Sequence, residues 1–140
     1  MSTINAVRGR TRYPGSIDSR LLSAFSDFAP HNMTANNAPT PFVVAASSYY
    51  SGTYPPFKAF DGSVEGQTTY WLTNSTQAGW LSIDTGNGNT YLLASYSVQV
   101  NKVPEPNRAP KAWTMEGSND GTTWDVLDTV TNQTSWGSGE

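Results

Sequence analysis

Five carboxylates in the second half of the chain come closest to a set of residues that could do chemistry. A glycosidase needs two carboxyl groups that face each other across a cleft, about 5 to 10 Å apart. Two of the five flank a predicted hairpin turn and two lie along one predicted strand, which is typical of turn formers and of residues on a solvent face. The sequence therefore predicts no acid/base pair from Asp84, Glu116, Asp120, Asp125 and Asp128.

The residues that serve most other catalytic and metal sites are nearly absent. The chain has no cysteine, and its one histidine, His31, lies in a polar, proline-rich region before the first predicted strand. A Ser-His-Asp triad, a Cys-His pair and a metal site built on His or thiolate all need such a side chain in an ordered position. We therefore predict that the protein is not an enzyme.

Three tyrosines suit a different task, the binding of a sugar. Tyr49, Tyr50 and Tyr54 lie between Ser and Gly residues in the stretch S-Y-Y-S-G-T-Y-P-P, where no hydrophobic period would bury them. A sugar ring can stack on an exposed aromatic ring while neighbouring polar groups bond its hydroxyls. The alternative is that the three rings cover one end of the fold.

The elements that must position these residues are predicted to be β-strands. Gly, Pro, Ser, Thr and Asn are plentiful, which is the composition of an all-β protein with many turns. Alternating and β-branched runs predict the strands, and Asp-Gly and Asn-Gly pairs predict the turns between them. The predicted strands span residues 42–47, 79–84, 91–100, 112–116 and 124–130. Their number and spacing predict an antiparallel β-sandwich.

Four of the five tryptophans lie in strand-like contexts. An indole buries about 150 to 250 Å² and so tends to dominate a small core. A stacking platform for sugars is the alternative use of such rings. We expect the interior of the sandwich to contain Trp71, Trp80, Trp113 and Trp124.

Residues 1–41 are predicted to be an extension that precedes the domain. A brief helical spacing over residues 17–28 predicts a short amphipathic helix, and the small and polar residues 32–41 predict a linker. The net charge is −3, and only Arg8, Arg10 and Arg12 form a basic group, so we expect no binding to nucleic acid. The extension lacks the apolar segment of a signal peptide, and no stretch is apolar enough to insert into a membrane.

Two ordered sets of residues resemble a known family. The first is A-F-D-G at 59–62, followed by Trp71 and by G-W-L-S-I-D-T-G at 79–86. The second is P-K-A-W at 110–113, followed by G-S-N-D-G-T-T-W at 117–124. In this order and spacing the sequence resembles the discoidin or coagulation factor 5/8 type C domains, whose fold is shared by family 32 carbohydrate-binding modules. The resemblance covers about residues 42–136.

The resemblance implies an eight-stranded antiparallel jelly roll with ligands held in loops at one end. Members of this family continue for one or two strands beyond the point that corresponds to Glu140. We therefore expect residues 42–140 to form a truncated sandwich that further chain or a partner completes, because an unclosed sandwich leaves an unpaired edge.

The resemblance also implies which loops meet a ligand. In loops that the family commonly uses for contacts, this chain has Asn74, Asn101, Asn107 and Arg108. Amide and guanidinium groups suit the recognition of hydroxyls, because they offer donors and acceptors in fixed directions. Together with the three loop tyrosines, these residues form the predicted glycan site.

Family chemistry further implies a structural Ca²⁺ at Asp61. Backbone carbonyls and a hydroxyl from Thr68 or Thr69 would supply other oxygen ligands, of which calcium takes six to eight. The alternative is a simple Asp61-Gly62 turn, which needs no metal.

The stretch R-A-P-K-A-W-T-M-E-G-S-N-D-G-T-T-W at 108–124 also looks like discoidin modules of bacteriophage tail and virion proteins. This likeness implies a non-catalytic adhesion module in a phage particle, such as a tail fibre, baseplate or decoration protein, which is oligomeric there and recognises glycan on the host surface. Residues 1–41 would then dock onto other virion proteins. The alternatives are a purely structural virion module and the accessory module of a bacterial glycoside hydrolase.

Overall fold

The computed structural model describes residues 32–63, 68–74, 78–86, 93, 95–100 and 109–136. Within these ranges strands predominate, and the only helix is a short 3-10 segment. In chain order the elements are β1 (Val43–Ala46), η2 (Pro56–Phe60), β2 (Leu81–Asp84), β3 (Trp113–Gly117) and β4 (Asp125–Val130). The prediction of an all-β protein is confirmed.

Strands β1 and β2 form one antiparallel ladder with an inner and an outer face. The register pairs Val44 with Ile83 and Ala45 with Ser82. Val44, Leu81 and Ile83 are buried, whereas Ala45 is exposed and Ser82 is half-buried. Because successive side chains of a strand point to opposite faces, the first set lies on the inner face and the second on the outer face.

Strands β3 and β4 form a second antiparallel ladder, which contains a bulge. Met115 pairs with Asp128 and Glu116 pairs with Val126, so that Leu127 between them is the extra residue. Every second residue of β3 is buried, while β4 is exposed at all but its last residue. Strand β3 therefore contributes to the core, and β4 lies outside it.

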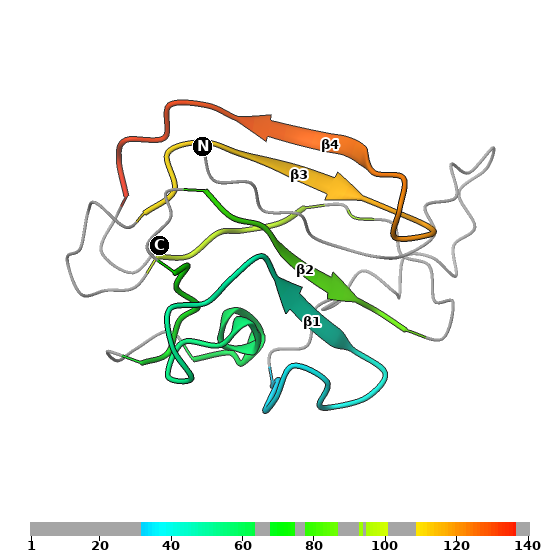
Figure 1. Ribbon diagram of the computed structural model, residues 1–140. Helices are drawn as coiled ribbons and strands as arrows, with labels where there is room; N and C mark the ends of the chain where they lie inside the picture. Colours follow the sequence, from blue (N-terminus) through cyan, green and yellow to red (C-terminus); the bar gives the residue numbers. More distant parts are fainter. Residues whose placement is uncertain are drawn as a thin grey trace.

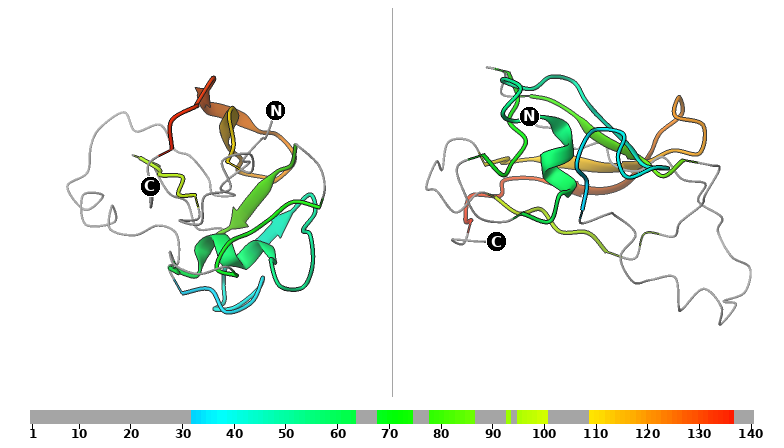
Figure 2. Two further views of the ribbon diagram at one scale, coloured as in Figure 1. Left: turned by 90° about the vertical axis from the view of Figure 1, so that its left-hand side faces the viewer. Right: turned by 90° about the horizontal axis from the view of Figure 1, so that it is seen from below.

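One apolar core joins the two ladders. Figures 1 and 2 show the β3–β4 hairpin on one side of β1–β2 and helix η2 on the other. The core contains residues from the segment before β1 and from three strands, and half-buried aromatic side chains such as Phe57, Phe60 and Trp71 pack against it. Its buried members are Met33, Val44, Leu81, Ile83 and Met115.

The segment predicted as a linker, residues 32–41, packs against the domain, and that prediction is wrong. Met33 is only 2% exposed and lies in the core. Its backbone N–H donates to the carbonyl of Phe60 at 3.1 Å, and the N–H of Val44 donates to the carbonyl of Asn36 at 2.6 Å. The folded unit therefore begins before β1. The predicted helix at 17–28 falls outside the described residues.

A tight turn after β2 depends on Gly86. Its φ is +63°, in the left-handed region that glycine tolerates best. A Cβ added there would lie 2.4 Å from the carbonyl oxygen of Pro41. The N–H of Gly86 donates to Oδ1 of Asp84 at 2.9 Å, which closes the turn. The end of β2 is thus held against the segment that precedes β1.

Residues 95–100 alternate as predicted, yet they are not a strand. Tyr96, Val98 and Val100 are half-buried, and the residues between them are exposed. Residues 95–100 belong to none of the four strands that the structure describes. The pattern of faces is therefore confirmed, and the predicted strand is not. In the part of the chain that the structure describes, no helix is long and apolar enough to cross a membrane.

The tryptophans divide between the two faces. Trp113 is buried, with 6% of its surface exposed, and Trp71 packs against the core, as predicted. Trp80 is 39% exposed, and Trp124 is half-buried beside the outer face of β1–β2. The prediction of a core position is therefore wrong for Trp80 and Trp124.

Candidate functional site

The loop after β1, residues 47–55, carries the three tyrosines predicted to bind sugar, and we call it the tyrosine loop. Three hydrogen bonds attach it to residues 71–74. The N–H of Tyr50 donates to the carbonyl of Leu72 at 2.8 Å, and Nε1 of Trp71 donates to the carbonyl of Ser48 at 2.9 Å. The N–H of Asn74 donates to Oγ of Ser48 at 3.2 Å. Because Trp71 also packs on the core, the loop is tied to the body of the domain.

The loop is also fixed from within, by a turn around Ser51. The N–H of Tyr54 donates to the carbonyl of Ser51 at 3.0 Å, and the N–H of Thr53 donates to its Oγ at 3.2 Å. Serine hydroxyls commonly stabilise turns in this way, by accepting from a backbone N–H two residues on. The backbone that carries the tyrosines is therefore ordered before any ligand arrives.

The tyrosine rings form a row. The centroids of Tyr50 and Tyr54 are 6.2 Å apart, with an interplanar angle of 58°. Those of Tyr54 and Tyr70 are 5.1 Å apart, with an angle of 37°. These distances are typical of contacting aromatic pairs. Tyr49 is 47% exposed and Tyr50 is 57% exposed, whereas Tyr54 and Tyr70 are half-buried. Two rings of the row, Tyr54 and Tyr70, are thus partly buried in the domain, and the third, Tyr50, faces solvent.

The structure brings together four of the seven residues predicted for the glycan site. Tyr49, Tyr50 and Tyr54 share the tyrosine loop, and the backbone of Asn74 bonds to it. The other three, Asn101, Asn107 and Arg108, lie outside the described residues.

Tyr70 belongs to the row, and the sequence analysis missed it. A signal was available in the stretch T-T-Y-W, because a residue next to a tryptophan that packs inward tends to point outward in an extended segment.

A comparison with protein families identifies this architecture. A family model described as F5/8 type C domain matches residues 43–140, which is more than half of the chain. The chain belongs to the F5/8 type C domain family. Members of this family are carbohydrate-binding modules and are typically non-catalytic. No curated protein and no solved structure matches the chain.

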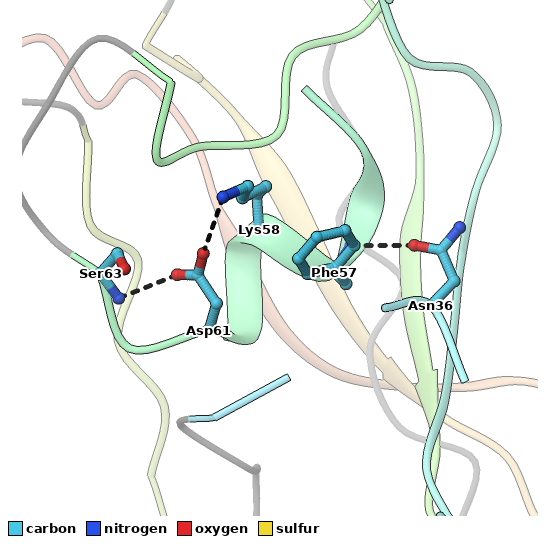
Figure 3. Close-up of polar contacts among 5 residues, drawn as sticks. All are labelled: Asn36, Phe57, Lys58, Asp61 and Ser63. Carbon is cyan, nitrogen blue, oxygen red and sulfur yellow. Dashed lines mark hydrogen bonds and ion pairs between the residues drawn. The ribbon is translucent and has the colours of Figure 1, made fainter. Parts of the chain in front are cut away.

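In this F5/8 type C domain, the acidic side chain implied for calcium lies at the end of helix η2. Asp61 is the C-cap residue, and Gly62 after it has φ of +76°, which confirms the predicted Asp-Gly turn. Oδ1 of Asp61 accepts the N–H of Ser63 at 2.8 Å, and Oδ2 lies 3.5 Å from Nζ of Lys58 (Figure 3). Both oxygens of the carboxylate are thus engaged, and one of them by a positive charge.

The described residues fit a turn better than a calcium site. Thr68 is exposed and Thr69 is half-buried in the segment that leads to Trp71. Calcium prefers several carboxylate and carbonyl oxygens that converge. Among the residues with a described position, no three acidic or histidine side chains gather in a way that could hold a metal ion. Lys58, one turn before Asp61, supplies the counter-charge that a bound cation would otherwise supply.

Two of the carboxylates considered for glycosidase chemistry, Asp120 and Asp128, are bonded within a turn and between segments of the F5/8 type C domain. Asp120 accepts the N–H groups of Thr122 and Thr123, both at 2.7 Å, through Oδ1. These backbone hydrogen bonds, above all the one from Thr123, hold the pKa of Asp120 well below its usual value. Asp120 is therefore a charged turn former, with the wrong pKa for a general acid.

Asp128 is bonded to a neighbouring segment. Its Oδ2 accepts the hydroxyl of Tyr96 at 2.5 Å, and that hydroxyl in turn accepts Nε1 of Trp113 at 3.1 Å. Burial and the hydrogen bond to Asp128 raise the pKa of Tyr96 above its ordinary value. The three side chains connect β3, β4 and residues 95–100, and so this carboxylate has a structural partner.

Proposed function

We propose that this F5/8 type C domain is a non-catalytic module that binds a cell-surface glycan on its tyrosine loop. The observation that carries the proposal is the row of rings. Tyr50 is 57% exposed and contacts the ring of Tyr54, which in turn contacts the ring of Tyr70. An exposed aromatic face without a protein partner costs free energy in water, and covering it with the C–H face of a sugar removes that cost.

The hydrogen-bonded backbone of the tyrosine loop supports sugar binding over the alternative in which the rings only cover one end of the fold. Six residues of the loop and of the segment beneath it share backbone and side-chain hydrogen bonds, namely Ser48, Tyr50, Ser51, Tyr54, Trp71 and Leu72. A site that is already ordered loses little conformational entropy when a ligand binds, and this raises the affinity that a small contact area can give. Asn74, whose backbone is bonded to the same loop, is a candidate to bond a sugar hydroxyl.

The finer proposal is that the module belongs to a bacteriophage particle and recognises its host. The support is the likeness of residues 108–124 to discoidin modules of phage tail and virion proteins. In a particle, many copies act together, and avidity converts a weak single-site affinity into firm attachment. Residues 1–41 would supply contacts to neighbouring virion proteins.

The competing proposal is a module that only joins virion proteins, with the tyrosine loop inside a protein interface. The same fold serves both roles, so the fold gives no preference. The two proposals predict different results for the isolated protein, because a glycan-binding loop must bind saccharide without any other protein present.

An array of bacterial surface polysaccharides and oligosaccharides tests the proposal. The purified full-length chain, labelled away from the loop, is expected to bind a subset of the array, and Tyr50→Ala is expected to lose that binding. Val126→Ala is the matched control, because Val126 is an equally exposed apolar residue (60%) on β4. Binding that is absent for the wild type, or equal for Tyr50→Ala and Val126→Ala, would remove the tyrosine loop from the account.

A further inference from the structure

The outer face of β1–β2 contains a groove that the tyrosine loop does not account for. The groove has a volume of about 390 Å³, and two tryptophans, Trp80 and Trp124, are among the residues that line it. This volume lies within the range of about 300 to 1,000 Å³ that is usual for small-molecule sites. The groove is not one of the loop sites predicted from the family resemblance.

The strand register explains why the outer face of the β1–β2 ladder has a groove at this position. Ala45 pairs with Ser82 in the middle of the outer face, and both side chains are short. Trp80 stands at one end, in phase with Ser82, and Asp84 lies at the other end, opposite Val43. Small residues thus form the floor, and larger ones form the ends.

The second wall comes from the β3–β4 hairpin. Gly121 and Trp124 of that hairpin line the groove, and Trp124 is half-buried there. The turn before Trp124 is fixed by Asp120, which accepts the N–H groups of Thr122 and Thr123. Both tryptophans are therefore attached to ordered backbone, since the N–H of Trp80 also donates to Oγ of Ser47 at 3.1 Å.

The chemistry of the lining favours a cation. Among the lining residues that the structure describes, Asp84 is the one with a charge, and none is Lys, Arg, Asn or Gln. Indole is the side chain whose face attracts a cation most strongly, and a carboxylate adds to the attraction. A sugar, by contrast, presents hydroxyls that need donors as well as acceptors, and among the described lining residues only Ser82 and the two indoles carry a side-chain donor.

We propose that the groove between Trp80 and Trp124 binds an organic cation, an alkylated ammonium group, with Asp84 as the counter-charge. Such a group occurs on small molecules and on lipid or polymer headgroups, and the shared chemistry is what the groove recognises. The methyl groups of such a cation cover apolar indole surface, and the carboxylate of Asp84, at the opposite end of the floor from Trp80, attracts its positive charge from a distance.

The indole N–H resonances of the full-length protein, in a proton–nitrogen correlation spectrum, test this proposal. Choline chloride is the probe, and its neutral carbon analogue 3,3-dimethylbutanol is the control, at constant ionic strength. Choline is expected to shift the Trp80 and Trp124 resonances and to leave those of Trp71 and Trp113 in place. The Trp80→Phe and Trp124→Phe variants assign the two resonances. The neutral analogue is expected to bind about tenfold more weakly, because it lacks the cation–π and ion-pair attraction.

Asp84→Asn tests the counter-charge. The amide retains an oxygen that can accept the N–H of Gly86, so this hydrogen bond can persist when the charge is removed. Affinity for choline is expected to fall by up to about fivefold, and affinity for the neutral analogue to stay the same. Tyr49→Ala is expected to leave choline binding unchanged.

Three results would overturn the proposal. These are an absence of choline-dependent shifts at Trp80 and Trp124, equal affinity for choline and its neutral analogue, and choline affinity in Asp84→Asn equal to that of the wild type. The comparison of choline with the neutral analogue needs no variant, so the proposal stays testable even if a substitution impairs folding.

Discussion

Replacing Tyr50 by Ala should weaken glycan binding about 5- to 30-fold with little effect on stability. An aromatic side chain has about 150 to 250 Å² to bury. With 57% of its surface exposed, Tyr50 leaves about 85 to 140 Å² open, of which one ring face is roughly half. Covering about 40 to 70 Å² at about 25 cal/mol/Å² contributes about 1 to 2 kcal/mol. That free energy corresponds to the expected loss of affinity.

The assay is isothermal titration with the soluble oligosaccharide that gives the strongest array signal. Tyr50→Phe serves as the matched variant, because it keeps the ring face and removes only the hydroxyl. We expect its affinity to stay within a few-fold of the wild type. Circular dichroism melting checks that each variant is folded, and the high exposure of Tyr50 predicts nearly unchanged melting temperatures.

The reasoning is refuted if Tyr50→Ala and Tyr50→Phe bind equally well. Equal affinities would mean that the ring face contributes no contact area. A large loss for both variants would mean that the hydroxyl, and not the stacked face, makes the decisive contact.

Three further predictions concern the parts of the domain that support the loops. Gly86→Ala should lower the free energy of unfolding by at least about 1 to 2 kcal/mol, because its φ is +63° and the new methyl group would meet the carbonyl of Pro41. Urea unfolding measures the change, and Gly52→Ala, with no atom within 4 Å of the added methyl, should stay close to the wild type. Because the folded-state pKa of Asp120 is lowered, its contribution to stability is present above the unfolded pKa, near 4, and is lost as the pH falls below that value towards the folded-state pKa. The melting temperatures of wild type and Asp120→Asn, measured between pH 2 and 6, should therefore differ more as the pH rises, because only the wild type carries the charge at the higher pH values. Finally, the melting temperature in excess calcium should equal that in chelator, because Lys58 already neutralises the carboxylate implied as a ligand.

Each of these predictions has an outcome that contradicts it. Equal stability of Gly86→Ala and Gly52→Ala would show that the turn after β2 relaxes without cost. Parallel pH profiles for wild type and Asp120→Asn would show that the charge of this side chain adds nothing to the turn. A rise of several degrees in calcium would show that the protein binds the ion, since a ligand that binds the folded state raises its stability.

Strands β1, β2 and β3 could be predicted because one face of each is buried. Leu81 and Ile83 alternate with residues on the outer face, and this period of two identifies β2 from the sequence, whereas an apolar run with two β-branched residues identifies β1. The same alternation, applied to Trp80, predicts an outward position in place of the expected core position. If Leu81 and Ile83 point inward, Trp80 must point outward, and the parity of the strand outweighs the tendency of a large ring to be buried.

Other features depend on contacts that no local pattern reveals. Residues 32–41 have no hydrophobic period, yet Met33 is in the core, and the segment is held by hydrogen bonds to Phe57, Phe60 and Val44. The contact of Tyr54 with Tyr70 joins two loops, and so it follows from the packing of the chain and not from spacing. Residues 95–100 show the reverse case, since alternation predicts which side chains face inward but not whether the backbone forms a regular strand.

The most direct measurement of the central claim is a map of where a bound saccharide lies. Backbone and aromatic resonances of the full-length protein, followed during titration with the oligosaccharide selected on the array, provide that map. We predict that the largest shifts fall on the tyrosine loop and on residues 70–74, with Tyr50 foremost. Shifts confined to the β3–β4 hairpin or to the groove beside Trp80, with the tyrosine loop unchanged, would contradict the account.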